Sequence, residues 1–411
     1  MTSTTTDEIA SPPKSWAVLR SPNFSKLWVA LALSMVGDFF SYVAIAWLVL
    51  QLTGSSLALG TVLLVQAVPR AALMLVGGAL VDRLSARLTM LASMGLRVAV
   101  VAPLALLVLT GRIQLWEVYV ASAVFGVVDA LFIPASQSIL PRLVADHDLE
   151  RGNAVLNVTR AASTVAGPAL AGVVVAAFGT GWAFAADAGC FAVGLPFVLW
   201  LRGAGAGASS AVAGLRAEIA AGFRYAWADP GIRVCLFVIA GIDFAANGAI
   251  GVGLPTLAHG RFGAGAAGLG ILLGAYGVGF TVGALAGGMI PRQDRIGWWL
   301  VAVSALMGAG FAAVGFIPTL LPAAVVIGVA TIAPGMANTL GITWLQRRTA
   351  SEMQGRVMSL VMLASVGLVP VAYALAGAIA QVNPTLLFVA AGGLMLATAA
   401  AAAASRTVRS I

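Results

Sequence analysis

Charge is scarce in this 411-residue sequence. Charged residues make up 9% of the chain and apolar residues 60%, whereas a soluble domain carries about 25% charged residues. A chain of this length with so few polar groups cannot cover a water-facing surface, so most of its surface must face lipid. The composition therefore predicts an all-α integral membrane protein and argues against a soluble enzyme.

Lysine, cysteine and histidine are also rare. The two lysines both precede residue 27 and no Gly-x4-Gly-Lys-Ser/Thr stretch occurs, which argues against nucleotide-driven pumping by this chain. Cys190 and Cys235 fall inside apolar runs and are interpreted as unpaired cysteines of membrane helices. His147 and His259 are interpreted as solvated loop histidines, and no His/Cys cluster has the spacing of a zinc site. We expect neither a metal nor a cofactor.

Long apolar runs dominate the rest of the chain. A membrane span needs about 20 apolar residues. Twelve such spans are predicted, at 26–51, 56–81, 88–110, 115–139, 153–178, 182–201, 231–257, 266–290, 296–316, 320–345, 357–380 and 384–404.

The loops between these spans are unequal in charge. Most arginines fall on one side, and only Arg112 and Arg261 fall in loops on the other. The positive-inside rule then places both termini in the cytoplasm, and it explains the net charge of +8 without a nucleic-acid partner. The excess of arginine over lysine and the abundance of alanine suggest a GC-rich genome, so we expect a bacterial inner-membrane protein.

The chain divides into two halves around its widest loop. We expect a disordered cytoplasmic N-terminus at 1–23, a six-helix bundle at 24–202, a cytoplasmic linker at 203–230, a second six-helix bundle at 231–405 and a tail at 406–411. Within the linker, apolar residues recur at helical spacing from Leu215 to Ala226, which predicts a short amphipathic helix on the inner surface.

The two halves resemble each other. Corresponding stretches lie about 200 to 210 residues apart, in the same order and orientation. The matched stretches are Asp38-Phe39 with Asp243-Phe244, Gly126 to Pro134 with Gly328 to Pro334, and Arg151-Gly152 with Gly355-Arg356. This is a parallel repeat, typical of two pseudo-symmetric bundles about an axis along the membrane normal.

Two motifs carry a resemblance to a known family. Gly78-x-Leu80-x-Asp82-Arg83-x-Ser85-x-Arg87 lies between spans 2 and 3, and Ser163-x3-Gly167-Pro168-x2-Ala171-Gly172 lies in span 5. The first resembles the loop 2–3 signature of the major facilitator superfamily, and the second resembles its antiporter signature. Ile133 to Gln137, Pro141 to Leu143 and Gly37-Asp38 resemble the branch that holds the enterobactin exporter and macrolide-efflux proteins.

The resemblance implies roles for several of these residues. In the family, the loop 2–3 acid is a latch between the halves in the outward-open state, so Asp82 is expected to pair with Arg142, within a gating set of Gly78, Asp82, Arg83, Arg87 and Arg142. The motif Gly167, Pro168, Gly172 accompanies export. The arginine that many drug/proton antiporters carry in span 4 is absent from 118–126, which puts their usual proton relay in doubt here.

Ionisable residues deep in the spans are the sharpest functional signal. Each costs roughly 2.5–3.5 kcal/mol unless it faces protein or water, so we expect these residues to line a central cavity or pair with one another. Asp38 and Arg70, at similar depth on adjacent spans, could form an ion pair. Three acids against two bases leave one acid free to carry a proton, with Asp38 the first candidate and Asp129 the second. The full set is Asp38, Arg70, Arg97, Asp129 and Asp243, with the uncharged Asn247 and the shallower Asp187 ranked lower.

The sequence therefore predicts a monomeric secondary transporter. Its expected activity is proton-coupled efflux of a small amphipathic organic molecule, such as a drug, siderophore or secondary metabolite, by alternating access. Three alternatives remain open at this point: a facilitator or importer of the same fold, a membrane receptor that kept the fold without transport, and a wholly structural charge network. The sequence does not identify the substrate.

Overall fold

The computed structural model describes residues 15–83, 85–201, 215–289 and 296–405. Twelve candidate membrane spans lie in these ranges, which confirms the predicted number. The helices of the first half are α1 Pro22–Thr53, α2 Ser56–Arg83, α3 Ala86–Leu109, α4 Leu115–Ile139, α5 Asp146–Phe178 and α6 Thr180–Leu199. Those of the second half are α8 Pro230–Gly248 with α9 Leu254–His259, α10 Gly265–Met289, α11 Ile296–Val314, α12 Leu320–Arg348, α13 Gln354–Val366 with α14 Val369–Val382, and α15 Pro384–Ala404.

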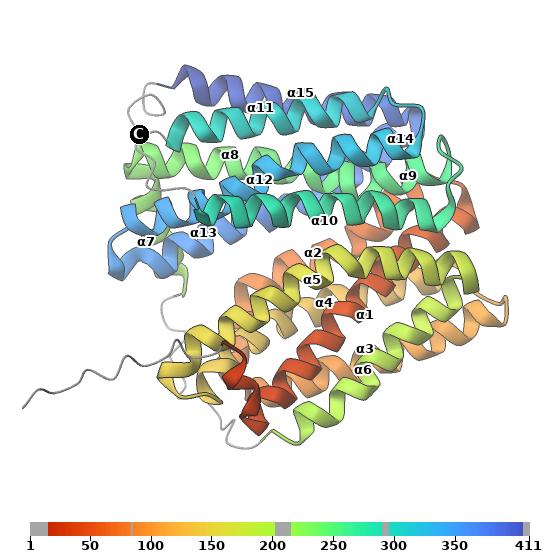
Figure 1. Ribbon diagram of the computed structural model, residues 1–411, viewed down its shortest axis with the longest axis horizontal. Helices are drawn as coiled ribbons and strands as arrows, with labels where there is room; N and C mark the ends of the chain where they lie inside the picture. Colours follow the sequence, from red (N-terminus) through yellow and green to blue (C-terminus); the bar gives the residue numbers. More distant parts are fainter. Residues whose placement is uncertain (1–14, 84, 202–214, 290–295, 406–411) are drawn as a thin grey trace, which may run out of the picture.

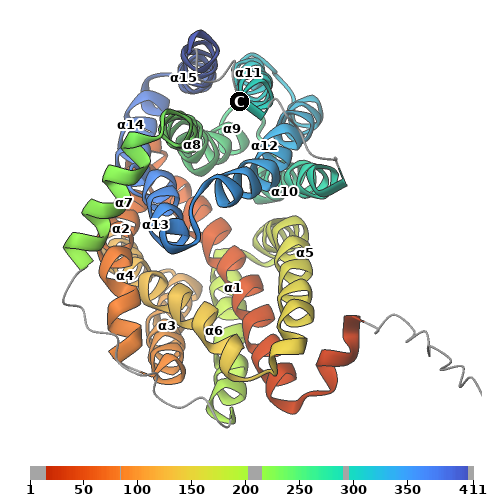
Figure 2. The ribbon, with the colours of Figure 1, turned by 90° about the vertical axis from the view of Figure 1, so that its left-hand side faces the viewer.

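The helices form two bundles that lie side by side (Figures 1 and 2). In the first, α1 packs on α5 and α6, α3 packs on α4 and α6, and α2 packs on α4. In the second, α8 packs on α15, α11 packs on α12 and α15, and α10 packs on α12. The same pairings recur in both halves, as the sequence repeat requires. The linker carries the expected helix, α7 Leu215–Ala228.

Two spans are interrupted. A π-helical turn, Ala249–Gly253, joins α8 to α9. The eleventh span is interrupted between Val366 and Val369. Pro370 lies at the second position of α14, where its missing N–H group leaves no intrahelical hydrogen bond unmade, so the span restarts there as a new helix.

The disordered N-terminus predicted for 1–23 is wrong in its last part. A 3-10 helix, Ser15–Arg20, precedes α1, which begins at Pro22. Val18 is buried at 2% exposure and packs in the same apolar cluster as Phe24 and Leu27. Burial of these side chains holds the segment on the bundle; residues 1–14 and the tail at 406–411 lie outside the described residues.

The molecule has two distinct ends. We call the end that carries α7 and the end of α15 the terminal end, and the opposite end, with the loops after α1, α3 and α5, the far end (Figure 1). At the far end the bundles touch directly: the Ser55 hydroxyl and the Leu57 amide donate to the Gln381 side-chain oxygen at 2.9 and 3.2 Å, and the Ser56 and Thr256 hydroxyls lie 3.0 Å apart.

Two helix crossings close the far end. At the α2–α14 crossing, a Cβ on Gly60 would lie 2.7 Å from the Cα of Gly377. At the α5–α10 crossing, a Cβ on Gly172 would lie 2.9 Å from the Cα of Gly270. Only glycine permits backbones to approach this closely. Toward the terminal end the axes of the two bundles diverge (Figure 1).

Asp229 anchors the junction between α7 and α8. Its carboxylate accepts hydrogen bonds from the amides of Gly231 and Ile232 at 2.7 and 3.2 Å, and from the Nε of Arg348 at 2.8 Å. Burial alone would raise the pKa of Asp229, but the hydrogen bonds from Arg348 and the two amides outweigh it and lower the pKa. The ionised carboxylate therefore stabilises the fold.

We expect Asp229→Ala to destabilise the purified protein by about 0.5–2 kcal/mol, because an N-cap is lost. Asp229→Asn keeps the cap and should lose only the charge. Since folding lowers this pKa, its stabilisation is present above the ordinary aspartate value of 3.8 and disappears as pH falls below it. Thermal unfolding as a function of pH measures both effects, and Asp148→Ala, which removes a surface ion pair with Arg151, is the control with little expected effect.

Candidate transport site

Charged side chains meet at depth in the N-terminal bundle around one guanidinium group. The Nη1 of Arg97, on α3, lies 2.7 Å from the Oδ1 of Asp38 on α1 and 3.2 Å from the Oδ1 of Asp129 on α4. The Nε of Arg97 lies 3.9 Å from the Oδ2 of Asp187 on α6. One cation thus faces three carboxylates from three different helices.

Two aromatic rings hold this guanidinium in place. The rings of Phe125 and Phe191 lie 4.7 and 4.6 Å from the Cζ of Arg97. A planar cation between two ring faces gains cation–π energy in addition to its ion pairs, and this effect is larger away from water. The Arg97 side chain is 6% exposed, so the cation is fixed while two of its acid partners reach the cavity.

The three carboxylates differ in exposure. The side chain of Asp38 is 47% exposed and that of Asp129 is 20% exposed, whereas that of Asp187 is fully buried. The Ser41 hydroxyl donates to the Oδ2 of Asp187, and the Oδ1 of Asp187 has no hydrogen-bond partner among the described groups. Asp38 and Asp129 are therefore the acids that solvent or a solute can reach.

The ion pair considered from the sequence, Asp38 with Arg70, is not the one formed. Asp38 pairs with Arg97, because α1 packs on α6 and α3 also packs on α6, which brings α1 and α3 to the same place. Among the described ion pairs none includes Arg70, whose Nε is buried without a hydrogen-bond partner. Asp187, ranked low from its sequence position, belongs to the cluster. Gly37 makes room for it, since a Cβ there would lie 2.6 Å from the Oδ1 of Asp187.

Two adjoining cavities lie beside the cluster. One, of about 270 Å³, is lined by Asp38, Arg97 and Asp129. The other, of about 280 Å³, lies between the bundles, with lining residues from α2, α8, α13 and α14. Both are lined by Tyr42, Leu63, Gln66 and Arg70. Together they fall within the size range of small-molecule pockets, about 300–1,000 Å³, and they combine charged, amide and aromatic groups.

The second bundle contributes an acid to the cavity between the bundles. Asp243 and Asn247, on α8, line it together with Ser365 and Tyr373. The Asn247 side-chain amide donates to the Asp243 carbonyl at 2.7 Å, so it steadies one turn of α8. Asp243 also lines a third cavity of about 130 Å³ inside the second bundle. Three of the five predicted ionisable residues, Asp38, Arg97 and Asp129, therefore meet at one point. The other two, Arg70 and Asp243, come from different bundles and line the same cavity between them.

The loop 2–3 residues are only partly described. The surroundings of Gly78 and the side chains of Asp82 and Arg83 lie outside the described residues, although the backbone of α2 continues to Arg83. Arg87 donates to the carbonyls of Val198, at 3.2 Å, and of Leu199. It thereby caps the C-terminal end of α6 within its own bundle. Arg142 ends the short 3-10 helix after α4.

The antiporter-like motif lies at two helix contacts. Gly167 lies against the Phe39 ring of α1, beside the acid cluster, and a Cβ there would collide with the ring. Gly172 lies at the crossing with Gly270 of the other bundle, and the carbonyl of Pro168 approaches Gly270 in the same crossing. The motif therefore connects the acid cluster to the contact that closes the far end.

His259 is not a solvated loop residue as interpreted from the sequence. It is partly buried, and its ring meets that of Trp47 edge to face at a centroid distance of 5.1 Å. Trp47 belongs to the first bundle and His259 to the second, so this pair is one more contact across the far end. His147 is exposed, as expected. Within the described ranges no group of three His, Cys, Asp or Glu side chains could hold a metal ion.

Sequence comparison finds efflux proteins among the relatives. A family model described as transmembrane secretion effector matches residues 13–410. The chain is 27% identical to the multidrug efflux pump Tap of Mycolicibacterium fortuitum over 88% of its length and 90% of that protein. It is 26% identical to the enterobactin exporter EntS of Citrobacter koseri over 82% of its length and 80% of that protein.

Comparison with solved structures identifies the fold. A crystal structure of a peptide transporter POT in complex with alafosfalin has a TM-score of 0.77, with 13% sequence identity, and covers 97% of this chain and 100% of that one. A crystal structure of the nucleoside transporter NupG has a TM-score of 0.73, with 11% identity, and covers 93% and 99%. At these identities the likeness concerns the fold alone.

Proposed function

Since this chain belongs to the transmembrane secretion effector family of the major facilitator superfamily, and is thus a multi-pass membrane transporter, we propose that it exports a small amphipathic organic molecule in exchange for protons. The relatives named for multidrug efflux and enterobactin export support the direction. Cavities that combine aromatic rings with charged and amide groups support an amphipathic substrate. On this proposal the chain works as a monomer.

We propose that the terminal end faces the bacterial cytoplasm and the far end faces outward. Lys26, Arg142 and Arg151 lie at the terminal end, whereas Arg112 and Arg261 lie at the far end. This bias supports the assignment through the positive-inside rule. With contacts across the far end and diverging bundles at the terminal end, the conformation then corresponds to an inward-facing state of alternating access.

The single observation that carries the coupling proposal is the ratio of acids to bases around Arg97. Three carboxylates face one guanidinium group, and a cluster with excess negative charge in low dielectric favours binding of a proton. Asp38 and Asp129 reach the cavity and share Arg97, so a proton on one acid leaves Arg97 to the other, and a substrate that binds at either acid competes with the proton for it. Competition of this kind couples the two fluxes.

The return to the outward-facing state needs contacts at the terminal end. We propose that Asp82 and Arg142 form the latch there, within the gating set that includes Gly78, Arg83 and Arg87. Such a latch would bias a two-state equilibrium without touching the pocket. Gly167, Pro168 and Gly172 would stabilise the inward-facing state, because they lie at the acid cluster and at the crossing that closes the far end.

Proton exchange can be measured in proteoliposomes that contain an internal pH-sensitive dye, with ethidium and enterobactin as probes. We expect the wild type to move protons when either probe is added and to accumulate it against a gradient. Asp38→Asn and Asp129→Asn should abolish proton movement but retain downhill exchange, because the cavity remains while its proton site is lost. Glu150→Gln, an exposed acid at the start of α5, is the matched control.

The same assay separates the alternatives. A facilitator would equilibrate a probe without moving protons, and an importer would accumulate it in the opposite direction. A receptor would bind a probe without turnover. Accumulation against a gradient by both aspartate variants would refute the assignment of the proton route to these acids.

A further inference from the structure

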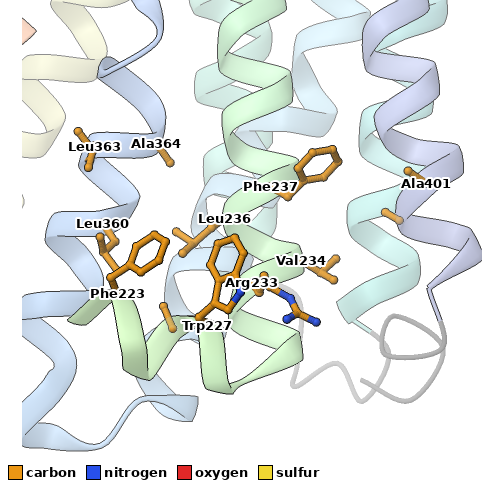
Figure 3. Close-up of a pocket in the computed structure, with 12 residues that line it drawn as sticks. Phe223, Trp227, Arg233, Val234, Leu236, Phe237, Leu360, Leu363, Ala364 and Ala401 are labelled. Carbon is orange, nitrogen blue, oxygen red and sulfur yellow. The ribbon is translucent and has the colours of Figure 1, made fainter. Parts of the chain in front are cut away.

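A groove of about 530 Å³ opens on the surface of the second bundle near the terminal end (Figure 3). Four helices form it: α7 supplies Phe223 and Trp227, α8 supplies Arg233 and Phe237, α13 supplies Leu363, and α15 supplies its small-residue wall. Apart from the one arginine, every lining residue is apolar or alanine. The groove is as large as a small-molecule site.

This groove is separate from the transport cavities. On α8, Val234 and Phe237 line the groove, whereas Cys235 and Val238 line the cavity inside the bundle. The two sets lie on different faces of the helix, about 100° apart, because each residue of an α-helix is rotated by that angle from the one before it. A molecule bound in the transport cavities therefore does not fill this groove.

The position of the groove along the membrane spans indicates that lipid surrounds it. The helices α8, α13 and α15 belong to candidate membrane spans, and Phe237 is 59% exposed toward the outside of the bundle. An apolar side chain exposed on a membrane span faces acyl chains. The mouth of the groove lies at Trp227 and at Arg233, the fourth residue of α8. Near the end of a membrane span, arginine and tryptophan side chains meet the lipid head groups.

Within the described residues, no ion pair neutralises the charge at the mouth. The Arg233 guanidinium lies 5.8 Å from the Trp227 ring centroid, and the Trp227 ring stacks on Phe223 with centroids 4.9 Å apart. The acid four residues earlier, Asp229, is engaged by Arg348 at 2.8 Å. Among the described ion pairs none includes Arg233, so an aromatic platform presents a cation at the membrane surface.

We propose that this groove binds an anionic glycerophospholipid, with its phosphate at Arg233 and one acyl chain along Phe223, Leu236 and Leu363. The apolar groove matches the chain, and the arginine at the head-group level matches the negative charge. Because α7 belongs to the linker between the bundles and forms one wall, the bound lipid joins this linker to the second bundle. The inference holds whether or not the chain exports an organic molecule in exchange for protons.

Native mass spectrometry of the full chain in neutral detergent tests the proposal, with dioleoyl phosphatidylglycerol compared with dioleoyl phosphatidylcholine. The wild type should bind the anionic lipid more tightly. Arg233→Gln should weaken phosphatidylglycerol binding about fivefold, the value expected for one basic residue near a membrane surface, and weaken phosphatidylcholine binding less, because the choline charge already offsets that lipid's phosphate. Ala401→Phe, which fills the groove, should weaken both.

Arg224→Gln is the matched control, because Arg224 is exposed on α7 but does not line the groove. Equal loss in Arg224→Gln and Arg233→Gln would mean a diffuse charge effect and would overturn the proposal, as would an unchanged preference in Arg233→Gln. If Arg233→Gln does not fold, the wild type can be tested in nanodiscs with dibromo-chain lipids. The quenching that is due to Trp227 is the difference between wild type and Trp227→Phe. This difference should be larger with brominated phosphatidylglycerol than with brominated phosphatidylcholine. Equal differences with the two lipids would overturn the proposal.

Discussion

Replacing Arg97 with glutamine is expected to destabilise the protein by about 3–5 kcal/mol, the typical cost of removing one partner from a buried ion pair. The side chain is 6% exposed and faces three carboxylates, so its loss leaves like charges together in a low-dielectric site. Arg97→Lys should recover only part of the loss, because an ammonium group cannot contact several acids in one plane or stack between Phe125 and Phe191 in the same way. Thermal and denaturant unfolding of the purified protein measure the effect.

Two further variants separate this effect from a general loss of charge. Asp187→Asn should partly rescue Arg97→Gln, since it removes the fully buried carboxylate of the cluster. Arg70→Gln should unfold close to the wild-type temperature but transport poorly, because Arg70 lines both cavities and has no described ion pair. Wild-type stability of Arg97→Gln would show that the cluster does not hold the first bundle together.

The architecture was predictable because it depends on properties that a sequence records directly. Span length follows from the bilayer thickness, and the order of the spans follows the chain. The repeat was visible because Asp38 and Asp243 recur at corresponding positions, and in the structure both face cavities. Depth in the membrane was also readable, and the residues that it selected include Arg97 and Asp129, which form an ion pair in the structure.

The pairing of these residues was not predictable, because it depends on which helices pack together and on which faces. Spans 1 and 2 are neighbours in sequence, so Arg70 was considered as the partner of Asp38. In the fold α1 packs on α5 and α6, and Arg97 on α3 takes that place. Asp187 was judged by its distance from the end of its span, but burial depends on its neighbours, and Gly37 makes room for it.

The interrupted spans have a similar explanation. The interruption between α13 and α14 depends on Pro370 together with the packing of α14 on α2. The sequence supplied the proline, but an apolar run of that length gave no reason to divide it. His259 was misjudged for the same reason, because its partner Trp47 lies in the other bundle and more than 200 residues away in sequence.

The second large effect is expected where the two bundles meet at the far end. A leucine at Gly172 would bring its Cβ to 2.9 Å from the Cα of Gly270, and one at Gly60 would bring it to 2.7 Å from the Cα of Gly377. Backbone cannot move aside as a flexible side chain can, so each substitution should force the far end apart. Overpacking of this kind costs about 1–3 kcal/mol, which shifts the balance between closed and open far ends by about five- to a hundred-fold.

Labelling of one buried position measures this shift. Ser56 is 5% exposed at the far-end contact with Thr256. In a background without Cys190 and Cys235, Ser56→Cys should react slowly with a membrane-impermeant maleimide in intact cells, and much faster when Gly172→Leu or Gly60→Leu is added. Transport should fall at the same time, because the state with the far end closed becomes less populated.

Gly189→Leu provides the matched control. A Cβ on Gly189 meets no atom within 4 Å, so the same substitution in a membrane helix adds bulk without a collision. Labelling and transport should then remain at wild-type values. If both crossing variants label as slowly as this control, the glycine contacts do not hold the far end closed. If Ser56→Cys in the crossing variants reacts only in everted vesicles, the far end faces the cytoplasm and the proposed orientation is reversed.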